Sequence, residues 1–116
     1  MSRQEIRKPQ SKIEITRALD NPFNIPEGEE VVDFTLHEVV GPGNGIILIM
    51  EIYEAPETGT KLVFDYVKTN GEIWRTSEYV YTGSQINMTF TNTVKLSMSA
   101  KGPLKGSYTS APRCLC

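Results

Sequence analysis

The sequence predicts an all-β protein: a single antiparallel β-sandwich of about eight strands, immunoglobulin-like or jelly-roll, with an extended N-terminal arm. Its 116 residues suit one domain. Apolar residues alternate with polar ones in runs rich in β-branched and aromatic types, and no stretch longer than about six residues keeps a helical period. Turn signals separate these runs at intervals of about 8–12 residues.

Alternation begins in residues 13–19 (IEITRAL), which predict a half-buried strand. Residues 21–30 (NPFNIPEGEE) predict a loop, because the prolines at 22 and 26 exclude a central strand. The next alternating run, residues 31–40 (VVDFTLHEVV), predicts another strand. We expect its core side to carry Val32, Phe34 and Leu36.

Residues 46–53 (IILIMEIY) follow a glycine-rich turn and begin apolar on both faces, which favours a well-covered central strand. The strongest local signal comes next, where Asn70-Gly71 divides residues 61–81 into two strand-like runs. This dipeptide favours a type I′ turn with a two-residue loop. In that register Tyr66 lies opposite Arg75, a guanidinium and ring pair that supports the prediction.

Three shorter runs complete the predicted sandwich. Residues 86–90 (INMTF) and 93–100 (TVKLSMSA) alternate between apolar and polar side chains. Residues 107–111 (SYTSA) predict a short last strand after the turn at 101–106.

A basic arm precedes this sandwich. We divide the chain into an arm (residues 1–12), a sandwich domain (residues 13–111) and a tail (residues 112–116). Of the 12 basic and 14 acidic residues, the part after the arm keeps 8 and 13, so a basic arm joins an acidic body. Such an arm suits docking on an acidic neighbour, including another copy of the body, while a solvated tail is the alternative. Its basic residues are Arg3, Arg7, Lys8 and Lys12.

Composition argues against several classes of function. The net charge of -2 and the pI near 5.4 give no global attraction to nucleic acid. The longest apolar run, residues 46–50, is far shorter than the roughly 20 residues of a membrane span. Because the charged N-terminus lacks the apolar core of a secretory signal, we expect a cytoplasmic protein with reduced thiols.

Candidates for catalysis are few. The single histidine, His37, lies on the polar phase of its strand, and we expect its side chain to be exposed. A catalytic histidine needs a nucleophile and an orienting carboxylate beside it, and the sequence contains no nucleophile motif. We therefore expect no enzymatic activity and no cofactor.

The only two cysteines, Cys114 and Cys116, end the chain as Cys-Leu-Cys. A disulfide between them would close a very small, strained ring, and a structural zinc ion needs four ligands. We expect no metal here. A contact or cross-link to another subunit and a plain tail are the alternatives that stay open.

Tyrosine and tryptophan residues, whose aromatic rings carry a polar group, suggest sugar binding as a second kind of function. A sandwich that presents several of them on one exposed face can stack sugars, although cross-strand packing explains them equally well. The residues concerned are Tyr53, Tyr66, Trp74, Tyr79, Tyr81 and Tyr108.

Residues 92–111 (NTVKLSMSAKGPLKGSYTSA) join an alternating apolar strand, a GPLxG-type turn and a short polar strand. This stretch, about a sixth of the chain, resembles the final strand pair of small β-sandwich proteins in tailed-phage virions. The resemblance implies a non-enzymatic virion structural protein, in particular a head-decoration or accessory capsid subunit, assembled in the host cytoplasm. Its partners would be copies of itself, the major capsid protein or other virion proteins, with no nucleic acid or membrane.

Under this hypothesis the arm and the tail reach across subunit boundaries. The alternative function is a carbohydrate-binding module of a receptor-binding or cell-surface assembly. The candidate partner-binding residues are Arg3, Arg7, Lys8, Lys12, Cys114 and Cys116.

Overall fold

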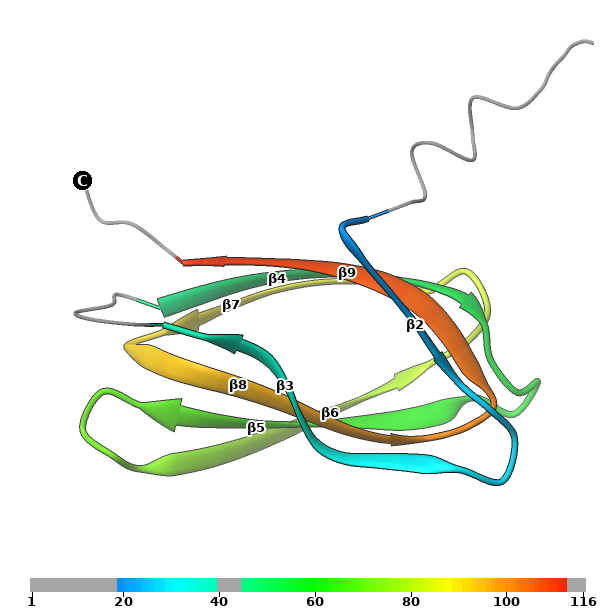
Figure 1. Ribbon diagram of the computed structural model, residues 1–116, viewed down its shortest axis with the longest axis horizontal. Coiled ribbons are helices and arrows are strands. Elements are labelled where there is room, and N and C mark those ends of the chain that lie inside the picture. The colour runs from blue at the N-terminus through cyan, green and yellow to red at the C-terminus, as the bar shows by residue number, and fades with distance from the viewer. Residues whose placement is uncertain (1–18, 40–44, 113–116) are drawn as a thin grey trace, which may run out of the picture.

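The computed structural model describes residues 19–39 and 45–112. This part of the chain contains eight strands and no helix, arranged as two four-stranded antiparallel sheets packed face to face (Figure 1). The predicted β-sandwich of about eight strands is therefore confirmed. The predicted strand at 13–19 and the Cys-Leu-Cys tail lie outside the described residues, apart from Leu19.

Each sheet combines strands from distant parts of the sequence. The first sheet, in spatial order, consists of β2 (Asn21–Ile25), β9 (Leu104–Pro112), β4 (Gly45–Glu54) and β7 (Gln85–Thr91). The second consists of β3 (Glu30–Glu38), β8 (Thr93–Lys101), β5 (Thr60–Lys68) and β6 (Ile73–Val80).

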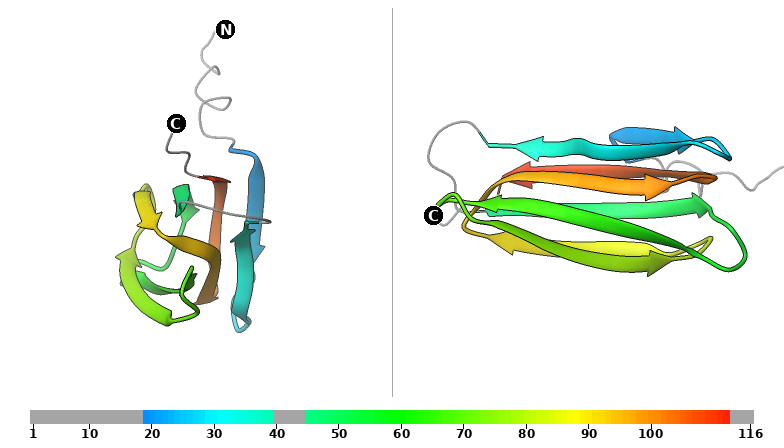
Figure 2. Two further views of the ribbon diagram at one scale, coloured as in Figure 1. Left: turned by 90° about the vertical axis from the view of Figure 1, so that its left-hand side faces the viewer. Right: turned by 90° about the horizontal axis from the view of Figure 1, so that it is seen from below.

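The strand pairs are nested. Among the described strands the first, β2, pairs with the last, β9, the second with the second-last, and so on inward to the β5–β6 hairpin. Two further pairings, β4 with β9 and β5 with β8, join these ribbons into the sheets. This order is that of a jelly roll rather than an immunoglobulin fold. Figure 2 shows the result from below, with β2 and β3 at one side of the sandwich and β6 and β7 at the other.

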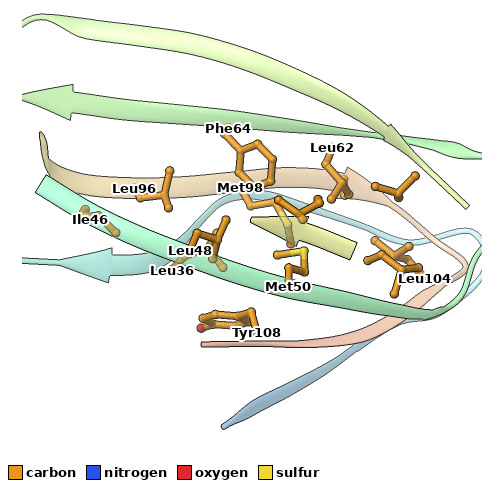
Figure 3. Close-up of a cluster of buried hydrophobic side chains, with 14 of the residues drawn as sticks. Leu36, Ile46, Leu48, Met50, Leu62, Phe64, Leu96, Met98, Leu104 and Tyr108 are labelled. Atoms are coloured by element: carbon orange, nitrogen blue, oxygen red, sulfur yellow. The ribbon is translucent and has the colours of Figure 1, made fainter. Parts of the chain in front are cut away.

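The core lies between the two sheets. Strand β4 occupies a central position, as predicted, and its inward residues Ile46, Leu48, Met50 and Ile52 are completely buried. Residues of the opposite sheet meet them (Figure 3). Fully burying one such side chain contributes about 1.5–3 kcal/mol, so this layer provides most of the driving force for folding. The opposing side chains are Leu62, Phe64, Leu96 and Met98.

Strand β3 departs from the predicted alternation. Val32 is 66% exposed and Phe34 is 44% exposed, whereas Val31 packs against the core. A β-bulge lies between Val31 and Phe34, where Asp33 adopts a φ of 54°. The extra residue puts Val31 on the core side in place of Val32. Phe34 lies opposite the buried Met98, but it stays largely exposed because β3 is an edge strand. The prediction that Val32 and Phe34 belong to the core was therefore wrong, while Leu36 is buried as expected.

The β5–β6 hairpin differs from the prediction by one residue of register. Lys68 N–H donates to the Glu72 carbonyl at 2.8 Å, which makes a three-residue loop of residues 69–71. Gly71 takes the left-handed φ of 92° whereas Asn70 does not, so the turn is not type I′. Asn70 instead accepts the Glu72 N–H on its side-chain oxygen at 3.0 Å, which stabilises the longer loop.

This register changes the cross-strand pairs. Tyr66 lies opposite Trp74, and Asp65 lies opposite Arg75, in place of the predicted pairing of Tyr66 with Arg75. The observed register places a carboxylate beside the guanidinium and two aromatic rings beside each other. Both pairs are chemically better matched than the predicted ones.

The predicted loop at 21–30 contains a short strand, β2. This strand lies at the edge of its sheet, so Pro22 does not interrupt a central ladder. The physical argument against a central strand was correct, but it did not exclude an edge strand. Its neighbour in the sheet, β9, begins within the predicted turn and extends to Pro112.

The bulge in β3 makes a testable prediction about two apolar residues. Leu48→Ala should lower the free energy of unfolding by about 2–5 kcal/mol, because it opens a cavity in a completely buried layer. Val32→Ala should change it by less than about 0.5 kcal/mol, because Val32 is mostly exposed. Urea unfolding measures both values, and similar losses in the two variants would contradict the bulged register.

Candidate functional site

Strand β6 is the most exposed element of the sandwich. It lies at the edge of its sheet and, among the described strands, it pairs only with β5. Apolar side chains are exposed on both of its faces: Ile73 is 72% exposed, Trp74 is 52% exposed and Tyr79 is 63% exposed. Large apolar side chains so accessible on a flat edge are typical of a surface that binds a partner.

The other three sheet edges are protected. Strand β2 contains Pro22, and β3 has two bulges, and both features discourage pairing with another chain. Strand β7 is regular, but its outward residues are polar, as Asn87 and Thr89 illustrate. Only β6 among these edges has no proline, no bulge and exposed apolar residues.

Backbone geometry shows which groups of β6 are available. The hydrogen bond between Lys68 and Glu72 sets the alternation along the antiparallel pair. Every second residue of β6 therefore directs its N–H and C=O away from β5. These residues are Ile73, Arg75, Ser77 and Tyr79, which also carry the side chains on the outer face of the sheet.

An ion pair occupies the outer face beside this edge. Arg75 Nε lies 2.7 Å from Asp65 Oδ1, and a second guanidinium nitrogen lies 3.2 Å from Asp65 Oδ2. These hydrogen bonds lower the pKa of Asp65, while burial opposes the shift and the charge of Arg75 adds to it. The two-pronged contact holds the guanidinium against the outer surface of the sheet.

An aromatic pair occupies the inner side of the same strand. The rings of Trp74 and Tyr66 lie 6.5 Å apart, and Lys68 Nζ lies 5.5 Å from the Trp74 ring centre. The Trp74 indole N–H donates to Glu72 at 3.1 Å. Tyr66 in turn packs 4.9 Å from Phe90, so the exposed indole is connected to the core through one ring.

The tyrosines considered for sugar binding do not gather around Trp74. Tyr79 points to the opposite face of β6, and Tyr81 follows the strand at the next turn, against Gly59. The other two tyrosines contribute to the fold: Tyr108 is buried, and the Tyr53 hydroxyl hydrogen-bonds to Ser107. Trp74 therefore shares its face with Tyr66 alone, which is only partly exposed.

His37 joins the two sheets and is not exposed as predicted. Its Nδ1 lies 2.8 Å from Ser110 Oγ on β9, and this hydroxyl donates to the Leu36 carbonyl at 3.1 Å. A second bulge in β3, between Thr35 and His37, turns the ring inward.

The direction of these hydrogen bonds bears on whether His37 could act as a general base toward Ser110. When Ser110 donates its only hydroxyl proton to the Leu36 carbonyl, the His37 Nδ1–H is the donor to Ser110. A general base has to accept the proton of its nucleophile, so the polarity is opposite to that of a catalytic pair. No carboxylate among the described residues hydrogen-bonds to the ring, and the arrangement fits a structural link.

Surface hollows on the outer faces are shallow. One hollow, of ≈ 360 Å³, lies on the second sheet between Lys61, Val63 and Lys101. The part of the chain that the structure describes has no group of three or more His, Cys, Asp or Glu side chains placed to hold a metal ion. Nor does it contain a helix that could cross a membrane.

The residues that the sequence nominated for partner binding, Arg3, Arg7, Lys8, Lys12, Cys114 and Cys116, lie outside the described residues. The surface on β6 was missed because edge position depends on strand order, which the sequence does not reveal. One signal was present. The run IWRTSEYV carries large apolar residues in both phases, which a strand with a single buried face does not need.

Comparison with protein-family models, with curated proteins and with solved structures finds no match to this chain.

The link between His37 and Ser110 gives a prediction for stability. Ser110→Ala should lower the free energy of unfolding by about 1–3 kcal/mol, because it leaves the Leu36 carbonyl and the His37 ring without their partner. Ser77→Ala, at an exposed position, should change it by less than about 0.5 kcal/mol. Chemical denaturation compares the two variants, and an unaffected Ser110→Ala protein would show that the link contributes nothing.

The pair of Asp65 and Arg75 gives a prediction for pH dependence. Because the pKa of Asp65 is lower in the folded protein than in the unfolded chain, the pair stabilises the fold above about pH 4. This stabilisation disappears as the pH falls through the lowered pKa. Arg75→Gln should therefore be less stable than the parent near about pH 7, and the difference in stability should be smaller near about pH 2.

Urea unfolding at the two pH values tests this expectation, with Lys61→Gln on the same face as the control. A constant difference between Arg75→Gln and the parent at both pH values would contradict it.

Proposed function

We propose that the protein is a non-enzymatic structural subunit of a phage virion, a head-decoration or other accessory capsid protein. The observation that supports this function best is the unprotected edge of β6. A small closed sandwich with an exposed apolar edge is built to bind other proteins, and its shallow hollows offer little to a substrate.

The fold class is compatible with the proposal. Jelly rolls are frequent in viral capsids and also in lectins, so the fold fits both this function and the alternative. The resemblance of residues 92–111 to virion proteins favours the capsid.

The proposed mechanism is mechanical. A strand of a neighbouring subunit adds to the outward N–H and C=O groups of β6, while Ile73, Trp74 and Tyr79 pack against it. The basic arm, residues 1–12, attaches to acidic surface on another subunit or on the capsid. Many weak contacts of this kind, repeated by symmetry, hold the subunit firmly on the particle.

Two variants test the contact through β6 and the contact through the basic arm separately. Ser77→Pro removes an outward amide of β6 without removing a hydrogen bond to β5, so the domain should stay folded while pairing with a new strand is blocked. Deletion of residues 1–12 removes the basic arm. Each change should weaken binding to capsids, or self-association, by about tenfold or more.

Size-exclusion chromatography and co-sedimentation with capsids of the virus that encodes the chain measure both effects. Ser77→Ala, which keeps the amide, is the matched control and should behave as the parent. If neither Ser77→Pro nor the arm deletion changes self-association or capsid binding, the proposed function is wrong.

A carbohydrate-binding module of a receptor-binding or cell-surface assembly is the second candidate. The exposure of Trp74, beside Tyr66 and Lys68, favours it, since an accessible indole is a common stacking surface. A glycan array with the parent and with Trp74→Ala tests it. Binding that Trp74→Ala abolishes would support this candidate, and an empty array would remove it.

A further inference from the structure

The outward groups of β6 limit how a second copy of this strand can pair with it. In an antiparallel pair, hydrogen bonds form between residues whose N–H and C=O groups point toward each other. On β6 these are the odd-numbered residues from Ile73 to Tyr79, because the even-numbered residues bond to β5. Two copies related by a two-fold axis therefore pair only when odd-numbered residues face odd-numbered residues. This condition excludes every register in which the axis falls between two residues.

Three registers remain in which most of the strand is paired, with the axis at Arg75, Thr76 or Ser77. An axis at Arg75 puts two guanidinium groups directly opposite each other, and like charges in such a pair are destabilising. An axis at Ser77 puts Ile73 opposite position 81, which lies beyond the end of β6 at Val80. The apolar side chain of Ile73 then stays uncovered, so the axis at Thr76 is favoured.

The register centred on Thr76 matches the outer side chains of β6 with one another. Ile73 lies opposite Tyr79 of the partner subunit, and the two-fold axis repeats this contact at the other end of the strand. Both side chains are largely exposed in the single subunit, so each covers the other on pairing. Between them Arg75 lies opposite Ser77 of the partner subunit, which brings no like charge near the guanidinium.

Charges are also complementary on the inner side of the strand. Trp74 lies opposite Glu78 of the partner subunit in this register. Lys68 Nζ lies 5.5 Å from the centre of the Trp74 ring, so the pairing brings a carboxylate toward an ammonium group. Opposite charges that meet across an interface fix its register and disfavour other partners.

We propose that the partner of β6 is β6 of a second copy of this chain, paired antiparallel about a two-fold axis at Thr76. Two four-stranded sheets then join into one sheet of eight strands, through about eight backbone hydrogen bonds. Because the pairing uses the same edge of both subunits, it closes at the dimer and leaves no open β6 edge. This inference rests on the proposed function for the use of β6 as a binding edge, and it names the partner.

Cysteine cross-linking of the full chain, in the absence of capsids, tests the register. Thr76 is the residue that the register places opposite its own copy, with the two Cα atoms about 4.5 Å apart, within the range of a disulfide. The native thiols are removed by Cys114→Ser and Cys116→Ser. In that background Thr76→Cys should form linked dimers at least about tenfold faster than Ser77→Cys, because the two copies of position 77 lie about 8 Å apart.

Thr89→Cys, at an exposed position on the β7 edge, is the matched control for random collision and should cross-link as slowly as Ser77→Cys. Urea unfolding shows whether each variant is folded. Equal rates for Thr76→Cys and Ser77→Cys would overturn the register. Equal rates for Thr76→Cys and Thr89→Cys would overturn pairing through β6.

Analytical ultracentrifugation gives a second readout that needs no introduced cysteine. Ile73→Lys and Tyr79→Glu should each raise the dissociation constant of the dimer by about tenfold or more, because each change removes an apolar contact on both sides of the axis. The two changes in one chain should restore part of the affinity, since the register brings opposite charges face to face. A double variant that dimerises no better than either single variant would contradict the register. A parent that stays monomeric up to about 100 μM would overturn the proposal.

These outcomes are separate from that of the proposed function, which co-sedimentation with capsids tests. If Thr76→Cys does not cross-link but Ser77→Pro weakens capsid binding, β6 binds a different strand and only this inference fails. If the dimer forms but the parent does not bind capsids, the inference stands and the proposed function fails.

Discussion

The fold depends on one layer of contacts, in which the inward side of β4 packs against the opposite sheet. The four inward residues of this strand are completely buried, and they meet leucine, methionine and phenylalanine side chains from β5 and β8. Figure 3 shows these side chains filling the space between the sheets. Because the hydrophobic contribution grows with the apolar area removed from water, the two sheets are held together mainly here.

The position of every other strand follows from this layer. Once β4 and β5 are central in their sheets, the nested pairing puts β2, β7, β3 and β6 at the four edges. Edges are the places where a sheet can pair with another molecule. At three of the four edges, proline, bulges or polar residues discourage such pairing. The remaining edge, β6, combines a regular backbone with exposed apolar side chains, and for this reason the proposed function is placed there.

The polar links of the molecule serve the same architecture. His37 and Ser110 connect the two sheets, and Asp65 and Arg75 stiffen the surface beside β6. The Ser110 hydroxyl lies within hydrogen-bond distance of both His37 Nδ1 and the Leu36 carbonyl, so it connects β9 to β3.

The sequence by itself determined the class of fold, seven of the eight described strands and the central position of the most apolar run. These follow from local patterns, since alternation and turn residues act over a few neighbours. The tertiary structure alone decided the bulges that expose Val32 and turn His37 inward, the one-residue register of the β5–β6 hairpin, and the order that leaves β6 at an edge. Each of these depends on which distant strands lie side by side, and no local pattern in a single sequence contains that information.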